Sequence, residues 1–349
     1  MQIRKLLRVI VCLFAVMMFP LAGFAAEGEE SIDTESGFYY TVQKGDTLWD
    51  ISQRFSDSAS LWPDLWNENR QIPNPHRIYP GERIRLLYHS DVESVTQVIT
   101  EKRAEQAEPV QEVKKEEGPY YYYSRINTAG FIREKPFTSL GVIFKVTEEK
   151  TLIGQGDLIY VKPAPNTGLT PGSHYTVYRI SEPIIDIETK ATIGIQHYLT
   201  GVIEIVKVMP EFVVATVARS YRAIKINDLL MPYRYRSPKI NLVESPRTVE
   251  GKIILGEERQ YAIGQGHVIF INKGFKDGVK AGQSFVVYYN ETHKFDPKAK
   301  EGIQLTPIYH GKLLVLHSEE TTSTTIVTRS VKTIHVGDKI LTPVPEFLR

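Results

Sequence analysis

Two stretches of the 349-residue chain repeat each other, and this repetition constrains the fold more than any other feature of the sequence. The segment "LIGQGDLIYV" (Leu152–Val161) is similar to "AIGQGHVIFI" (Ala262–Ile271), which lies 110 residues later in the chain. The same offset aligns Gly141–Met231 with Gly251–Leu341 without a gap. Self-similarity of this kind indicates two copies of one structural unit.

Each copy has the pattern of a series of short strands. Runs rich in β-branched and aromatic residues, such as "HYTVYRI", "GVIEIVKV" and "FVVATVARS", are separated by glycine, proline and asparagine, which favour turns. Five or six strands in about 90 residues can close into a small barrel or pack as a sandwich. We therefore expect two tandem, duplicated all-β domains, at residues 119–235 and 236–349, and the pattern leaves both architectures open.

The repeated "GQG" does not fit a phosphate-binding loop. Such loops need a further glycine and a helix N-terminus behind the turn. The strand-like runs "DLIYV" and "HVIFI" follow instead. Turns that require a positive φ explain the shared glycines without any ligand.

Residues 1–25 have the three-part layout of a secretory signal peptide. Basic residues precede the apolar run Val9–Phe19, and the small residues of "AGFAA" follow it. This layout predicts export, with cleavage after Ala25 or Ala26. The alternative is an uncleaved membrane anchor, but the apolar run is shorter than the roughly 20 residues that span a bilayer. No later segment is apolar enough to cross a membrane, so we expect no transmembrane segment in the mature chain.

The sequence offers little for catalysis. The one cysteine, Cys12, lies within the predicted signal peptide, so the mature chain should have no disulfide, thiol nucleophile or cysteine metal ligand. The histidines form no HxH, HxxxD or HExxH group, and no Gly-x-Ser-x-Gly elbow is present. We expect no catalytic residue, no metal and no cofactor. The alternative is a cell-wall-modifying enzyme with an unrecognised active site in the β-domains.

Residues 89–118 differ in composition from the rest of the chain. Their charged part, residues 91–118, carries eight acidic and four basic side chains and no aromatic residue. Such a segment cannot bury enough apolar surface to offset its ordering entropy, which predicts a charged flexible linker. A short helix within residues 101–107 is the alternative.

Before this segment, the hydrophobic pattern changes at Gly45-Asp46. Alternation over Tyr39–Gln43 predicts a strand, and "TLWD" fits a capping box that begins a helix. "SASLWPDLWNENR" predicts a second helix, and "RIRLLY" predicts a closing strand. The expected order over residues 38–88 is strand, helix, helix, strand.

The residues that carry this order are "YTVQKGDTLWDISQRF" and "LWPDLWNENRQIPNPHRIYPGERIRL". They resemble the LysM domain, a module that binds N-acetylglucosamine polymers. The resemblance covers residues 38–88 and implies an α+β fold of βααβ order, with two helices on one face of a two-stranded antiparallel sheet. The β-repeats are similar only in a general way to small β-domains of periplasmic assembly proteins, and we assign them to no family.

The resemblance also implies a shallow glycan groove between the strand-to-helix loop and the helix-to-strand loop. The residues of these loops are Gly45, Asp46, Thr47, Leu48, Asn74, Pro75, His76, Arg77 and Ile78. Exposed backbone groups beside a small apolar pocket can recognise the amide, carbonyl and methyl of an N-acetyl group. The contact is small and uncharged, so one such module should bind weakly.

Several of these residues would be needed for the fold alone. The turn and the helix cap require Gly45, Asp46 and Thr47 whether or not a sugar binds. The tryptophans stand at helical spacing, which is more typical of a core, although Trp49 or Trp62 could stack on a sugar.

The charge of the chain is uneven. Residues 119–349 contain 29 basic and 22 acidic side chains, whereas residues 38–88 contain six of each. Six basic residues cluster where the first repeat ends: Arg219, Arg222, Lys225, Arg234, Arg236 and Lys239. They predict either an ordinary solvated surface or a site for an anionic envelope polymer or an acidic protein partner. Nucleic acid is not an expected partner of an exported protein.

The sequence thus predicts an exported, non-catalytic protein of a bacterial periplasm or cell envelope that binds peptidoglycan. Its LysM-like module would tether the duplicated β-domains to the cell wall. Two alternatives remain open. One is the cell-wall-modifying enzyme described above, and the other is an assembly factor for an envelope machine, for which wall binding is incidental.

Overall fold

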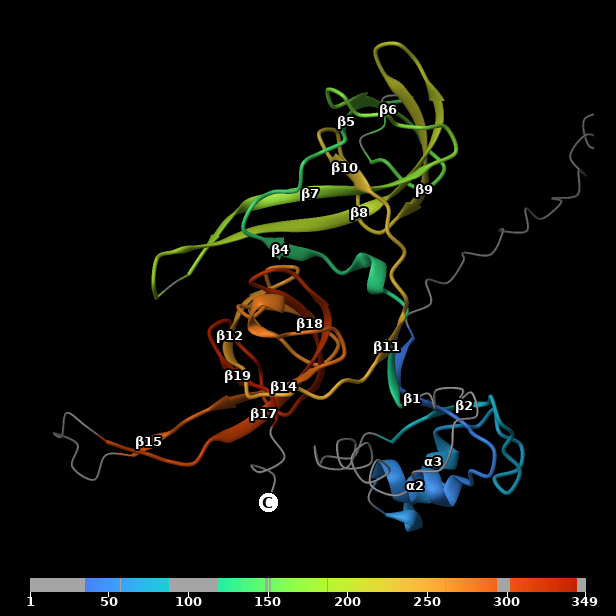
Figure 1. Cartoon of the computed structure of the whole chain (residues 1–349), viewed down its shortest axis with the longest axis vertical. Helices are drawn as coiled ribbons and strands as arrows, with labels where there is room; N and C mark the ends of the chain where they lie inside the picture. Colours follow the sequence, from blue (N-terminus) through green and yellow to red (C-terminus); the bar gives the residue numbers. More distant parts are fainter. Residues whose placement is uncertain are drawn as a thin grey trace, which may run out of the picture. The chain divides into compact units, whose positions relative to one another are not determined.

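The computed structural model describes residues 35–56, 58–87, 118–147, 150, 152–186, 188–260, 262–293 and 302–343. The predicted signal peptide and nearly all of the predicted charged linker lie outside the described residues. Among the described residues, the α-helices lie in the N-terminal region, and strands form most of the remainder (Figure 1).

The N-terminal region has the predicted order of strand, helix, helix and strand. Its elements are β1 (Ser36–Thr41), α2 (Leu48–Ser56), the 3-10 turn η1 (Ala59–Leu61), α3 (Trp62–Asn67) and β2 (Arg83–Arg85). The second predicted helix is thus divided into η1 and α3, with Pro63 in the first turn of α3, where proline's missing N–H is tolerated. Its core contains Tyr40, Val42, Leu48, Ile51, Phe55, Leu65, Ile72, Ile84 and Leu86.

The sheet of this region has four strands, where the resemblance implied two. β1 is antiparallel to β2 on one edge and to β3 (Tyr120–Tyr123) on the other, and β3 pairs in turn with β11 (Lys239–Asn241). The two added strands come from the ranges predicted for the β-repeats, and β3 covers backbone groups that β1 would otherwise expose. Since the chain returns to β1 at β3, the predicted linker connects two strands of one sheet.

The first β-domain lies between β3 and β11 in the chain. Its strands are β4 (Phe131–Arg133), β5 (Gly141–Val146), β6 (Leu158–Pro163), β7 (His174–Ile185), β8 (Thr192–Val208), β9 (Val213–Ser220) and β10 (Leu229–Pro232), and η2 (Ile126–Thr128) precedes them. They form one sheet in the order β4-β8-β7-β10-β5-β6-β9, and β8 also pairs with β9. That pairing closes β5-β6-β9-β8-β7-β10 into a ring, while β4 lies along the first part of β8.

The second β-domain is a closed barrel in the order β12-β13-β18-β17-β14-β19 (Figure 1). Its strands are β12 (Glu250–Gly256), β13 (Val268–Ile271), β14 (Ser284–Tyr289), β17 (Ile308–Ser318), β18 (Ser323–Ser330) and β19 (Lys339–Leu341). A small hairpin of β15 (Thr292–His293) and β16 (Ile303–Gln304) projects between β14 and β17, and η4 (Phe275–Asp277) follows β13. Of the two predicted architectures, the barrel is therefore the one observed.

Residues 110 positions apart occupy matching places in the two β-domains. Val177 lies opposite Gly201, and Val287 lies opposite Gly311. An isolated bridge joins Ile153 to Ile224 in the first domain and Ile263 to Ile334 in the second. The order of strands around each ring is also the same, so the sequence repeat corresponds to one repeated topology.

The two β-domains contact each other along β4. The hydroxyls of Thr322 and Thr324 donate to the carbonyls of Ile132 (2.7 Å) and Gly130 (2.8 Å). The Gly130 N–H donates to the Glu257 carboxylate at 2.6 Å, and within its own domain Gly130 leaves no room for a Cβ beside the His197 carbonyl. Buried apolar side chains from both domains, namely Ile132, Ile254 and Phe270, pack in one cluster.

Candidate functional site

The two loops predicted to hold a glycan meet at a hollow of about 260 Å³. The residues that line it are Asp46, Thr47, Leu48, Trp49, Trp62, Pro75, His76 and Ile78. Six of the nine predicted site residues are thus brought together. Gly45, Asn74 and Arg77 belong to the same loops but do not line the hollow.

Two tryptophans form walls of this hollow. Trp49 projects from the first turn of α2 with 56% of its surface exposed. The Trp62 ring lies 5.9 Å from the His76 ring, with 49° between their planes, and it also packs against the domain core. Trp66 instead donates its indole N–H to the Ile72 carbonyl at 2.9 Å. Trp49 and Trp62 therefore offer aromatic surface to a ligand, a role that helical spacing alone did not favour.

Asp46 shapes the first loop through its carboxylate. Oδ2 accepts hydrogen bonds from the Tyr40 hydroxyl and the Gln43 N–H, both at 2.8 Å, and Oδ1 lies 3.6 Å from Nη2 of Arg54. Burial and the hydrogen bond to Asp46 raise the pKa of Tyr40 to about 12. Gly45, the residue before Asp46, has a φ of +97°, a conformation that favours glycine. The carboxylate is therefore engaged within the turn, and the loop forms the rim of the hollow.

Thr47 caps α2, whose first residue is Leu48, and forms one half of the predicted capping box. Its Oγ1 accepts the Asp50 N–H at 3.1 Å, and its hydroxyl donates to the Asp50 carboxylate at 2.6 Å. The cap therefore satisfies one of the free N–H groups of the first helical turn. The same turn carries Trp49, so the cap also supports this wall of the hollow.

The second loop is held by Asn74. Its side-chain oxygen accepts the His76 N–H and its carbonyl accepts the Arg77 N–H, both at 3.0 Å. This turn presents His76 at the hollow. Asn74 therefore shapes the loop, whereas Arg77 is exposed and lies outside the lining.

The six basic residues singled out near the end of the first repeat have different surroundings. Arg222 forms ion pairs with Glu257 (3.3 Å) and Glu258 (2.6 Å). Lys239 lies in β11 with its amine 4.4 Å from the centre of the Tyr120 ring. Arg219 and Lys225 are exposed, while Arg234 and Arg236 line a second hollow.

Two aspartates at matching positions of the repeats, Asp228 and Asp338, stabilise turns through their carboxylates. The Asp228 carboxylate accepts the Lys225 N–H at 3.0 Å, and the Asp338 carboxylate accepts the His335 N–H at 2.9 Å. Asp228 also forms a bidentate ion pair with Arg179, at 2.7 and 2.8 Å. Across the described ranges, no group of three histidine, cysteine or acidic residues could hold a metal ion.

The βααβ module thus has an aromatic-walled hollow between two of its loops. Residues 40–86 match the family model of the LysM domain, so this part of the chain is a LysM domain, which is a glycan-binding module. The uncharacterized protein YqbP of Bacillus subtilis (strain 168) is 37% identical over 57 residues, or 14% of this chain. These residues are 26% of that relative, so the chain spans about a quarter of its length.

No helix within the described residues is both long and apolar enough to span a bilayer.

Proposed function

We propose that the chain is an exported, non-catalytic peptidoglycan-binding protein whose LysM domain holds two β-domains at the cell wall. The hollow between the two loops carries this proposal. An N-acetylglucosamine unit has a ring with apolar C–H faces and an amide with a methyl group. Trp49 and Trp62 offer surface for the ring, and the loop that begins at Asp46 offers backbone groups for the amide.

The electrostatics of the hollow suit an uncharged ligand. Asp46 is the one carboxylate among its lining residues, and that group is already bonded within its own turn. No lysine or arginine is among the lining residues. A neutral glycan can therefore enter without leaving a buried charge unpaired. Binding to the wall polymer supports a location in the bacterial envelope or periplasm.

Titration with N-acetylglucosamine oligomers, followed by calorimetry or NMR, tests the proposal. We expect Trp49→Ala to weaken binding about fivefold, because loss of one aromatic contact costs about 1 kcal/mol. Tyr79→Ala is the matched control, since Tyr79 is also an exposed aromatic (60%) but lies outside the hollow. Equal affinities of the two variants would contradict the assigned site. Clearing of peptidoglycan in a zymogram would contradict the non-catalytic role.

A further inference from the structure

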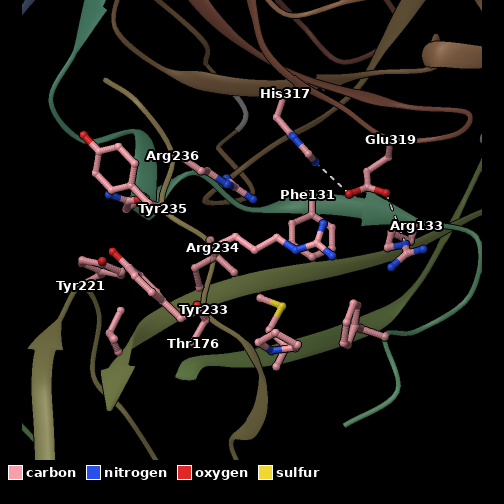
Figure 2. A pocket seen from close by; sticks show the side chains of 16 residues that line it. Phe131, Arg133, Thr176, Tyr221, Tyr233, Arg234, Tyr235, Arg236, His317 and Glu319 are labelled. Atoms are coloured by element: carbon pink, nitrogen blue, oxygen red, sulfur yellow. Dashed lines mark hydrogen bonds and ion pairs between the residues drawn. The ribbon is translucent and has the colours of Figure 1, made fainter. Parts of the chain in front are cut away.

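A second and larger hollow, of about 520 Å³, lies in the β-domains and shares no lining residue with the LysM hollow (Figure 2). It is lined by residues of β4 and β17 and by the segment that follows β10, whose sequence is "YRYR" (residues 233–236). Arg133, Arg234 and Arg236 line it, against a single carboxylate, that of Glu319. The hollow therefore has an excess of positive charge.

The carboxylate of Glu319 already has partners. Its Oε1 lies 2.8 Å from Nε2 of His317, and its Oε2 lies 3.3 Å from Nε of Arg133, as the dashed lines in Figure 2 show. Glu319 is thus matched by groups at one end of the hollow. Arg234 and Arg236 carry the remaining positive charge, and Glu319 offsets that of Arg236 only in part.

Within the described residues, these two arginines form no close ion pair with a carboxylate. Arg236 is half-buried, donates to the Ala129 carbonyl at 2.8 Å, and lies 6.0 Å from the centre of the Phe131 ring. Burial lowers the pKa of Arg236, which reflects the cost of removing this charge from water. The carboxylates of Glu319 and Glu257 act on Arg236 electrostatically in the opposite direction and raise its pKa, but in the part of the chain that the structure describes neither forms a close ion pair with Arg236 or Arg234. A bound anion would offset that cost.

Aromatic side chains form part of the remaining lining, beside aliphatic residues such as Leu199, Val202 and Met231. Tyr221, Tyr233 and Tyr235 line one side, and Phe131 lies among the groups that face them in Figure 2. Phe131 is held in place by His197, whose ring stacks on it at 4.7 Å with 12° between the planes. Aromatic surface beside guanidinium groups suits a ligand with both a ring and a negative charge. The volume falls within the roughly 300–1,000 Å³ of small-molecule sites.

We propose that this hollow is a second binding site, which takes a small anionic sugar. Arg234 and Arg236 bind the carboxylate or phosphate of the sugar, and the tyrosines contact its ring. The site is independent of the LysM hollow, so a result that contradicts it leaves the proposed peptidoglycan binding unaffected, and the reverse also holds.

Calorimetry on the full chain with Trp49→Ala, which should weaken sugar binding at the LysM hollow, tests this site with four probes. N-acetylmuramic acid supplies a carboxylate, N-acetylglucosamine 6-phosphate supplies a phosphate, N-acetylglucosamine is the neutral sugar, and inorganic phosphate is the anion without a sugar. We expect at least one charged sugar to bind about tenfold more tightly than the neutral sugar and the free phosphate, because charge-assisted hydrogen bonds add to the ring contacts. The carboxylate and phosphate arms show which anion is preferred.

The variant Arg234→Ala should weaken binding of that sugar about tenfold. Arg234 is exposed, so its loss should leave the fold intact. The matched control is Arg219→Ala, which removes an exposed arginine outside the hollow. Weakening by both variants to the same extent would indicate diffuse charge attraction and overturn the proposal. So would equal binding of charged and neutral sugars, or binding of free phosphate as tight as that of the charged sugar.

Discussion

At the scale of single residues, buried polar side chains position the loops that form the LysM hollow. Asn69 illustrates this, because its side-chain amide is fully buried and fully bonded. Its Nδ2 donates to the carbonyls of Leu65 (2.7 Å) and Arg85 (2.8 Å), and its Oδ1 accepts the Arg85 N–H at 2.7 Å. The end of α3 is thereby joined to β2, on either side of the loop that carries His76.

We expect Asn69→Ala to destabilise the LysM domain by about 3 kcal/mol, since it leaves several buried backbone groups without partners. Urea unfolding followed by tryptophan fluorescence measures this domain selectively, because all three tryptophans lie in it. Asn67→Ala, at an exposed position of α3, should change the free energy of unfolding by less than about 0.5 kcal/mol. Equal effects of the two variants would show that the Asn69 bonds are not stabilising.

At the scale of elements, the turns that precede β6 and β13 are built alike. Gly156 and Gly266 have φ of +86° and +84°, the left-handed region that favours glycine. The residue after each glycine accepts the N–H of the first glycine of "GQG", from Gly154 to Asp157 at 2.9 Å and from Gly264 to His267 at 3.2 Å. The turns therefore explain the most similar segments of the two repeats.

Gly156→Ala should destabilise the first β-domain by about 1–2 kcal/mol, because alanine is strained at this positive φ. Gly154→Ala is the control, since Gly154 has no such φ and a Cβ there would meet no atom within 4 Å. The measurement is urea unfolding followed by circular dichroism. In the second domain, Gly266→Ala should likewise be destabilising, and Gly264→Ala is the matching control. Indistinguishable unfolding of Gly154→Ala and Gly156→Ala would contradict the strain assigned to this turn.

The sequence predicted local elements better than it predicted their partners. Hydrophobic alternation and turn residues predicted the LysM order and the strands of the repeats, because these signals act over a few residues. They did not predict that β3 pairs with β1, since the run "YYYY" favours a strand but contains nothing that selects a partner. The choice between barrel and sandwich was open for the same reason.

The residues of the candidate sites were also predictable only where short local sequences form the site. The resemblance predicted most of the residues at the LysM hollow, because that site is made of two short loops with characteristic sequences. The second hollow was found only in part, through Arg234 and Arg236. Its other residues, such as Arg133 and Glu319, are brought in by contacts between the two β-domains, which are distant in sequence. The alternation "YRYR" was the available local signal.

At the scale of the whole molecule, Glu257 is a charged group at the contact between the two β-domains. Only 5% of the residue is exposed, and its carboxylate accepts the Gly130 N–H and pairs with Arg222. Burial raises the pKa of Glu257 above its usual range. The folded protein therefore binds this proton more tightly than the unfolded chain does, so this group's contribution to stability falls as pH rises through the raised pKa.

We expect Glu257→Gln to remove the loss of stability that Glu257 causes as pH rises. The glutamine amide oxygen can still accept the Gly130 N–H. The free energy of unfolding of the variant, relative to the natural protein, should increase from about pH 4 to about pH 7. Urea unfolding by circular dichroism across this range measures the difference. Glu258→Gln changes an exposed carboxylate on the same arginine and should show no such increase. Parallel curves for both variants would contradict a raised pKa at Glu257.

In the proposed function, the LysM domain attaches the whole chain to peptidoglycan. Deleting the domain would be a poor test, because it removes β1, with which β3 pairs. Sedimentation of the full chain with purified sacculi, for the natural protein, Trp49→Ala and Tyr79→Ala, is the most direct measurement. We predict that the natural protein and Tyr79→Ala pellet alike, that Trp49→Ala pellets less, and that excess N-acetylglucosamine oligomer releases the bound protein. Equal pelleting of all three proteins, unaffected by the oligomer, would contradict the claim.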